Sequence, residues 1–140
     1  MKGETMAPSD CFLVEITLRV RYKETDMMGF VHHSNYVAYF EEARSEYARR
    51  KGTPYSEFEK AGYFLAVTEI NIRYIKPAYY EQKIIVRTWL TALRSRGLTF
   101  EYEIVDQDSG NILVKGHTKH ICITRDGQAT KLPDRWRAWE

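Results

Sequence analysis

A short polar segment near the start of the chain combines one carboxylate with two adjacent histidines and runs into a predicted helix. The segment reads RYKETDMMGFVHHSNYVAYFEEAR over residues 21–44 and contains Asp26, His32 and His33. A carboxylate at such a place can attack a carbonyl carbon or activate a water molecule as a general base. The segment is therefore the first candidate for a catalytic site.

The start of the predicted helix adds a second chemical group, the backbone amides of its first turn. These amides, near Asn35 and Tyr36, have no intrahelical acceptor and lie at the positive end of the helix dipole. They can hold an oxyanion, and Gly29 allows a tight bend between the acid and the helix. An acid beside oxyanion donors suits acyl transfer. The alternative is that Asp26 is only a turn residue, because aspartate favours turns by bonding to its own backbone.

The histidine pair does not indicate a metal site. Side chains at adjacent positions seldom point the same way, and no third ligand is evident in the sequence. His33 can orient a water molecule or donate to the leaving group, or it can be an ordinary histidine bonded to backbone at the helix start. For His32 we favour the structural role. Glu41 and Glu42 have basic partners at helical spacing and are interpreted as part of a charged helix face.

Changes in the hydrophobic period predict the elements that hold this segment. Residues 12–22 alternate apolar and polar side chains, as in a strand with one buried face. From Ser34 apolar residues recur every three or four positions until Gly52, which predicts a helix of about 16 residues with Ser34 or Asn35 as its N-cap. A short helix is expected over residues 54–62. Further strands are predicted at Phe64–Pro77, Gln82–Arg94, Leu98–Asp106 and Ile112–Thr124, followed by a short closing helix in the tail.

The order of these elements indicates an α+β protein with a mainly antiparallel sheet. One long helix and five long strands predict a five-stranded sheet curled around a central helix. Such an open sheet has two edges with unpaired backbone groups, so pairing with a second copy is expected. The alternative is a monomer whose edge is short or is blunted by charges such as Lys115 and Lys119.

Composition places the chain among ordinary soluble globular proteins. Its 140 residues predict a single domain spanning 1–140, with a loose leader at 1–11 and a C-terminal tail at 126–140. A net charge of +2 gives no reason to expect a nucleic-acid partner, and no apolar run is long enough for a membrane span. The leader lacks the apolar stretch of a signal peptide, and Cys11 and Cys122 show no metal or redox spacing. We expect a cytoplasmic protein with free thiols, and one disulfide between the two cysteines is the alternative.

The polar segment, with INIRYIKPAYYEQKIIVRTWL at residues 70–90 and TFEYEI at 99–104, resembles the hot-dog-fold acyl-CoA thioesterases of the 4-hydroxybenzoyl-CoA thioesterase type. The likeness covers about Val14 to Thr124. Its most specific part is tyrosine–x–x–threonine–aspartate followed by glycine, histidine, asparagine and tyrosine. The resemblance implies a hot-dog fold, in which the sheet wraps around the long helix. It also implies homodimers that share a continuous sheet, often paired into homotetramers, with the site at the dimer interface.

The resemblance implies roles for particular residues as well. The family's catalytic aspartate falls on Asp26, the histidine before the helix on His33, the helix-start asparagine on Asn35 and the following tyrosine on Tyr36. Coenzyme A would be part of the substrate, so no separate cofactor and no metal are expected.

Substrate-binding residues are predicted around this acid. The acyl pocket should be apolar and draw on residues that are mostly core in any interpretation: Gly29, Phe30, Val31, Tyr36, Phe40, Phe64 and Val67. The turn formed by Arg94, Ser95 and Arg96 offers groups for the phosphates of coenzyme A, as basic turns do in some members of the resembled family. A solvated basic turn is the alternative.

Three function hypotheses follow. The first is hydrolysis of an acyl or aroyl thioester carried by coenzyme A or by acyl carrier protein. The second is a hot-dog module that binds a thioester without cleaving it; Asp26 argues against this, because binding an anionic ligand does not require a carboxylate. The third is a dehydratase or hydratase on the same fold, whose local motif differs from the one seen here.

Overall fold

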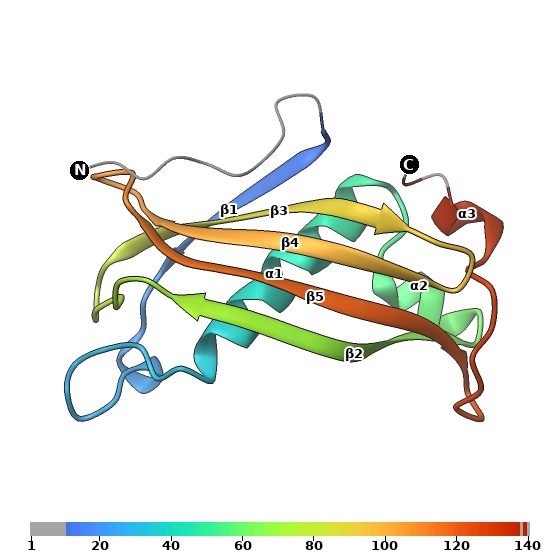
Figure 1. Cartoon of the computed structure of the whole chain (residues 1–140), viewed down its shortest axis with the longest axis horizontal. Helices are drawn as coiled ribbons and strands as arrows, with labels where there is room; N and C mark the ends of the chain where they lie inside the picture. Colours follow the sequence, from blue (N-terminus) through green and yellow to red (C-terminus); the bar gives the residue numbers. More distant parts are fainter. Residues whose placement is uncertain (1–10, 138, 140) are drawn as a thin grey trace.

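One five-stranded antiparallel sheet and a long helix make up most of the molecule (Figure 1). The computed structural model describes residues 11–137 and 139. The strands lie in the order β1-β3-β4-β5-β2, and each neighbouring pair is antiparallel. The predicted α+β class and five-stranded sheet are confirmed. The strand bounds are β1 Leu13–Arg19, β2 Tyr63–Tyr74, β3 Lys83–Leu93, β4 Gly97–Asp106 and β5 Ile112–Thr124.

Helix α1, Asn35–Arg50, lies across one face of the sheet, behind it in Figure 1. Its apolar stripe is buried, because Tyr36, Phe40 and Tyr47 are at most 3% exposed. These residues are separated by four and seven positions, which is the spacing of one helix face. The predicted helix is confirmed, and so is its end before Gly52, whose φ is +79°.

The centre of α1 approaches the sheet so closely that strand β5 has a glycine there. A Cβ atom at Gly116 would meet the carbonyl oxygen of Asn71 at 2.5 Å and the ring of Phe40 at 2.9 Å. The Phe40 ring stacks on Tyr102 of β4, with the ring centroids 4.1 Å apart. Gly116 therefore sets how deeply the helix lies on the sheet, and with it the positions of the groups that the helix carries.

The first strand ends earlier than its alternating pattern predicts. Strand β1 stops at Arg19, and after the buried Val20 the chain forms a 3-10 helix, η1 Tyr22–Glu24. Tyr22, predicted on the buried face, is 77% exposed, so this part of the prediction is wrong. The alternation fails because the chain leaves the sheet to reach the helix start, where side chains no longer follow a period of two.

Two short helices close the end of the molecule away from η1. Helices α2, Tyr55–Lys60, and α3, Asp134–Arg137, form where short helices were predicted. The rings of Phe58 and Trp136 pack between them with their centroids 4.0 Å apart. None of the helices formed by residues 11–137 and 139 has the length and hydropathy to span a membrane. Of the predicted leader, residues 1–10 lie outside the described residues.

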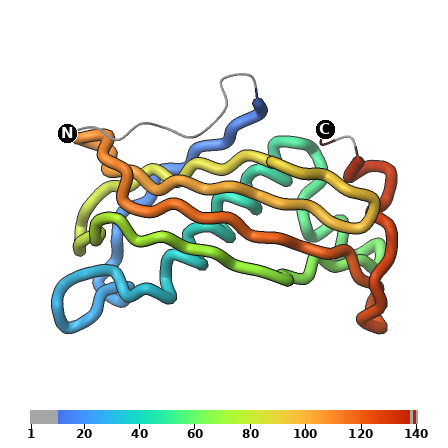
Figure 2. The backbone as a smooth tube through the Cα atoms, in the orientation of Figure 1, coloured from blue at the N-terminus to red at the C-terminus, as the bar shows by residue number. Residues whose placement is uncertain are grey.

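Strands β1 and β2 form the two edges of the sheet (Figure 2). The predicted strand to Pro77 ends at Tyr74 in β2, which is still the longer of the two edges. Several apolar side chains are exposed on this edge: Val67, Ile70 and Tyr74, joined by Ile75 just beyond the strand. An edge of this kind is a surface to which a further strand can bind.

Candidate functional site

The loop that joins β1 to α1 carries the predicted acid in a closed turn. The amide of Asp26 donates to the carbonyl of Phe30 (2.8 Å), and the amide of Gly29 donates to the carbonyl of Asp26 (3.0 Å). Gly29 has a φ of +81°, which a residue with a side chain rarely adopts. Thr25 and Val31 close the base of the loop as an isolated bridge. The predicted bend at Gly29 is confirmed, and it holds Asp26 in a fixed place.

The side chain of Asp26 combines a structural oxygen with an available one. Oδ1 accepts from the amides of Met28 (2.9 Å) and Phe30 (3.3 Å), which is the turn role that aspartate often has. Both bonds are made by Oδ1, so Oδ2 has no hydrogen-bond partner among the described residues. The turn role and the catalytic role are therefore compatible in one carboxylate.

A hollow of about 360 Å³ opens beside this carboxylate. Its walls are largely apolar and aromatic, and Lys76 adds a cation. We call it the Asp26 hollow. It brings together five of the predicted site residues, namely Asp26, Phe30, Val31, His33 and Tyr36. The other residues that line it are Met28, Tyr74, Ile75, Lys76 and Pro77.

The first two residues of α1 are occupied by bonds within the protein. The side chain of Asn35 donates to the carbonyl of Glu24 (2.8 Å), and its backbone amide donates to the carbonyl of His32 (2.9 Å). The hydroxyl of Tyr36 accepts from the amide of Ala78 (3.2 Å), and burial raises the pKa of Tyr36. Both residues therefore shape the loop and the wall of the hollow. The Asn35 amide, predicted as a free oxyanion donor, already has an acceptor.

The two histidines lie at the exposed rim of the loop. Their rings are 4.2 Å apart. Nδ1 of His32 lies 2.8 Å from the hydroxyl of Ser34, and Ser34 stands at the N-cap position without a side-chain bond to the helix. His33 lines the Asp26 hollow, and Tyr74 donates to its carbonyl at 3.4 Å. Within the described part of the chain, no three histidine, cysteine, aspartate or glutamate side chains are placed to hold a metal together.

Glu24 anchors the loop, although the sequence patterns do not single it out. Its buried carboxylate accepts from the amide (2.8 Å) and guanidinium (2.9 Å) of Arg21 and from the hydroxyl of Tyr39 on α1 (2.9 Å). Burial disfavours the charged form, but these bonds outweigh it and hold the pKa of Glu24 below its ordinary value. One signal in the sequence is the three-residue step from Arg21 to Glu24, which is the spacing of a capping box. Glu24 thus ties the chain ahead of Asp26 to the helix.

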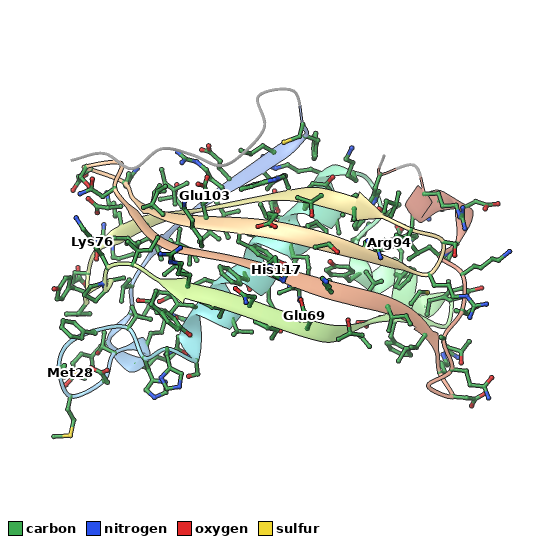
Figure 3. All side chains as sticks on the ribbon, in the orientation of Figure 1. Met28, Glu69, Lys76, Arg94, Glu103 and His117 are labelled. Carbon is green, nitrogen blue, oxygen red and sulfur yellow. The ribbon has the colours of Figure 1, made fainter. Side chains whose placement is uncertain are left out.

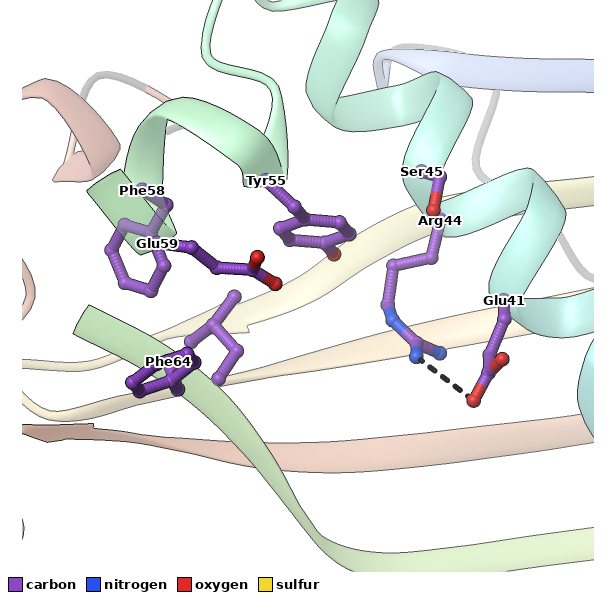
Figure 4. Close-up of a pocket in the computed structure, with 8 residues that line it drawn as sticks. Glu41, Arg44, Ser45, Tyr55, Phe58, Glu59 and Phe64 are labelled. Carbon is purple, nitrogen blue, oxygen red and sulfur yellow. Dashed lines mark ion pairs between the residues drawn. The ribbon is translucent and has the colours of Figure 1, made fainter. Parts of the chain in front are cut away.

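Phe64 and Val67, predicted for the acyl pocket, lie apart from Asp26 in the single chain. Phe64 lines a separate cavity of about 260 Å³ near the start of β2, and Val67 is exposed farther along that strand. This cavity is drawn in Figure 4, and we call it the Arg44 cavity. The residues that line it are Glu41, Arg44, Ser45, Tyr55, Phe58, Glu59, Phe64 and Leu65.

The predicted basic turn lies at the other end of the sheet. Arg94, Ser95 and Arg96 line a hollow of about 400 Å³ together with Lys119 of β5. Figure 3 shows Arg94 and the loop residue Met28 toward opposite ends of the molecule. In a single chain, the predicted site residues are therefore divided among separate hollows.

Comparison with known proteins identifies relatives along most of the chain. The family model described as "Thioesterase-like superfamily" matches residues 20–139. The acyl-CoA thioester hydrolase YbgC of Escherichia coli O6:H1 is 27% identical over 106 residues, which are 76% of this chain and 78% of that protein. A solved structure of the hypothetical protein TT1821 from Thermus thermophilus is 38% identical, with a TM-score of 0.85 over 90% of this chain and 96% of that one. A DHNA-CoA thioesterase from Staphylococcus aureus is 33% identical, with a TM-score of 0.85 over 91% of this chain and 85% of that one.

Proposed function

Because the chain belongs to the thioesterase-like superfamily, we propose that it hydrolyses an acyl or aroyl thioester of coenzyme A, with Asp26 as the catalytic carboxylate. The predicted family and its hot-dog fold are confirmed by the family match and the similar solved structures. One observation carries the role of Asp26: two backbone amides fix its Oδ1, while its Oδ2 has no partner among the described residues. The carboxylate is thus both held in place and chemically available.

Two reaction routes are open to Asp26. In the first, Oδ2 attacks the thioester carbonyl carbon, the carbon–sulfur bond breaks, and a mixed anhydride forms that water then cleaves. In the second, the carboxylate takes a proton from a water molecule whose oxygen attacks the same carbon. In both routes the coenzyme A thiolate leaves and takes up a proton, and the acyl group is released as a free acid. His33 lines the same hollow, where it can bond to the water or the leaving sulfur.

We also infer that the working protein contains two copies joined at their β2 edges. Antiparallel pairing of two β2 strands would place the start of one strand beside the end of the other. The Arg44 cavity lies at the start of β2, whereas Tyr74 and Ile75 of the Asp26 hollow lie at its end. The hollow of one copy and the cavity of its partner would then form one continuous site. The exposed apolar side chains of β2 support this arrangement, because pairing would cover them.

The basic turn is proposed to hold the phosphates of coenzyme A. Arg94 and Arg96 share a hollow with Lys119, and guanidinium and ammonium groups are common partners of phosphate. Coenzyme A belongs to the substrate in this proposal, so no separate cofactor is needed. A homotetramer and a cytoplasmic location stay predictions from the sequence.

Asp26→Asn tests the catalytic role most directly. Asparagine keeps an oxygen for the two amides and removes the charge, so we expect the fold to survive and turnover to fall at least about a hundredfold, or roughly 2.7 kcal/mol. The assay is free-thiol release from short, long and aromatic acyl-CoAs and from an acyl carrier protein thioester. Asp108→Asn is the matched control, because Asp108 is exposed in the β4–β5 turn.

The native protein and Asp26→Asn together also distinguish hydrolysis from the other hypotheses for this fold. Equal turnover by native protein and Asp26→Asn would mean that Asp26 is only a turn residue. Binding of thioesters without cleavage by either protein would identify a binding module. Cleavage restricted to the carrier-protein thioester would replace coenzyme A by acyl carrier protein in the proposal.

A further inference from the structure

A further hollow lies at the corner of the molecule where β1 begins and where β3 and α1 end (Figure 1). Its volume is about 500 Å³, which is within the range of roughly 300–1,000 Å³ for small-molecule sites. We call it the Lys51 hollow, after the charged residue in its wall. It shares no lining residue with the Asp26 hollow, with the Arg44 cavity or with the hollow at Arg94. The proposed reaction therefore leaves it unused.

The Lys51 hollow is open because β3 extends past the strand beside it. The first residue of β1, Leu13, pairs with Trp89, so residues 90–93 of β3 have β4 on one side and no described strand on the other. Alternate N–H groups of an extended strand point to opposite sides, so part of those in residues 90–93 point away from β4. No described residue accepts from them there. The strand edge thus offers free donors beside the hollow.

Lys51 supplies the charge of the hollow, and its ammonium has no described counter-ion. Nζ lies 4.2 Å from the ring centroid of Phe12 and 5.8 Å from that of Tyr47. Lys51 forms no ion pair with a described carboxylate, and no aspartate or glutamate is among the described residues that line the hollow. A cation at the end of α1 suits the helix dipole, but the dipole does not require it to lie over two rings. The ammonium is therefore available to an anionic ligand.

Aromatic side chains form much of the remaining wall. The rings of Phe12 and Tyr47 meet edge to face with their centroids 5.2 Å apart, and Trp139 meets Tyr47 in the same way at 5.3 Å. Phe12 is 43% exposed, so part of its ring is open to a ligand. A further aromatic ring can add to such a cluster by the same kind of contact. The hollow thus combines a flat apolar space with one positive charge.

We propose that the Lys51 hollow binds an aromatic monocarboxylate. The ring of this ligand would pack against Phe12, Tyr47 and Trp139. Its carboxylate would pair with Lys51 and accept from the free N–H groups of residues 90–93. One ammonium balances one carboxylate, whereas a phosphate ester would bring unbalanced charge against apolar walls. This site is separate from the proposed hydrolysis and does not depend on it.

The test compares three ligands by titration calorimetry with the full chain: 2-naphthoate, the uncharged 2-naphthamide, and acetate, which has the charge without the ring. We expect native protein to bind 2-naphthoate at least about tenfold more tightly than either of the others. Lys51→Met removes the charge and keeps a long apolar side chain. It should weaken 2-naphthoate binding at least about fivefold and change 2-naphthamide binding little. Lys60→Met, at an exposed lysine of α2, is the matched control and should keep the native affinities.

Ala92→Phe tests the location of the ligand without changing charge. Ala92 is a partly exposed residue of the hollow wall, so a phenylalanine ring there should fill the space and weaken 2-naphthoate binding at least about tenfold. Thermal unfolding of both variants checks that the fold is intact, and Ala92→Phe decides if Lys51→Met fails to fold.

Two results would overturn the inference. One is equal binding of 2-naphthoate and 2-naphthamide by native protein, or no binding of either, which would leave the open edge of β3 to an extended peptide. The other is native affinity for 2-naphthoate in both folded variants, because the ligand would then occupy another site, such as the Asp26 hollow. Thioester hydrolysis is not measured in these titrations, so the proposed function stands or falls separately.

Discussion

The Asp26 hollow and the Arg44 cavity are built in opposite ways. The acid in the hollow is held by backbone amides only two and four residues away along one loop. The arginine in the cavity is held through Tyr102, Thr118 and His120, which lie on two strands of the sheet. The first arrangement is local and partly exposed, and the second is non-local and buried.

This difference teaches that an accessible polar group and a buried one place different demands on the fold. A reacting carboxylate needs a free oxygen and contact with water, which a loop on a rigid scaffold supplies. A buried polar group needs partners in a fixed direction, because an unpaired donor is costly in a dry place. We expect changes in the loop to act mainly on turnover, and changes in the buried hydrogen bonds of Arg44, Tyr102, Thr118 and His120 to act mainly on stability.

Thr118→Val should give the largest loss of stability, because Thr118 is the middle member of the buried hydrogen bonds that link Arg44, Tyr102 and His120. Valine has a similar shape but no hydroxyl, so Tyr102 and His120 each lose a hydrogen-bond partner. Tyr102 then keeps only its bond from Arg44 and Nε2 of His120 is left unpaired, which should lower the free energy of unfolding by about 3 kcal/mol, measured by urea denaturation. Thr17→Val, at an exposed position of β1, is the control and should change it by less than about 0.5 kcal/mol. An equally small loss of unfolding free energy in Thr118→Val would mean that the hydrogen bonds of Thr118 add no net stability.

Mild acid should lower the protein's free energy of unfolding by about 2 kcal/mol between pH 7 and pH 5, because His120 is buried. The pKa of His120 falls from 6.5 to about 3 on folding, so the unfolded state binds more protons in this interval. Its contribution to stability is full above pH 6.5 and is lost as the pH falls toward 3. His120→Gln should flatten this dependence in urea denaturation, whereas His33→Gln, in the Asp26 hollow, should keep it. Equal slopes in all three proteins would contradict a neutral, buried His120.

Glu24→Gln should cost less stability, about 1 kcal/mol, and should lower kcat several-fold with KM nearly unchanged. Glutamine loses the charge that bonds to Arg21, so the loop ahead of Asp26 is held less firmly. Because the pKa of Glu24 is lowered in the fold, its stabilisation is present above the ordinary value of 4.5 and is lost as the pH falls below it.

Urea denaturation at several pH values and steady-state thioester hydrolysis measure these two effects of Glu24→Gln. Glu42→Gln, on the exposed side of α1, is the control and should change neither. A change in stability with native kcat would place Glu24 in the scaffold of the loop and remove it from the positioning of Asp26.

The loop side of the Asp26 hollow could be predicted because its residues are contiguous in the sequence, whereas the opposite wall, residues 74–77, comes from the end of β2 and has no such local signal. Asp26, Gly29 and His33 lie within eight residues, and the bend between them needs only a glycine. The sheet and α1 follow from hydrophobic periodicity, which reports on residues inside regular elements. The errors lie at the ends of elements, as at Tyr22 and Pro77, where the chain leaves the sheet and the period no longer applies.

The Arg44 cavity could not be predicted in the same way. Arg44 follows Glu41 by three residues, a spacing that indicates a charged helix face but does not say which neighbours cover a side chain. Its bond to Tyr102 joins residues 58 positions apart, and the bonds onward to Thr118 and His120 lie on a different strand. The sequence predicts Phe64 and Asp26 in one pocket, but in a single chain they line different hollows, which the proposed pairing of two chains would bring together. No local pattern carries either kind of information.

The pairing of β1 with β3 delays assembly of the site while the protein is being synthesised. Glu15 and Arg87 bond across this pair although they are 72 residues apart. The ribosome releases β1, the Asp26 loop and α1 first, but they have no sheet to pack against until β3, β4 and β5 have followed. The apolar face of α1 is exposed in the nascent chain until then, and chaperones recognise such surfaces. Non-local strand pairs of this kind form more slowly than local contacts, so Asp26 exists in the chain well before the hollow around it is complete.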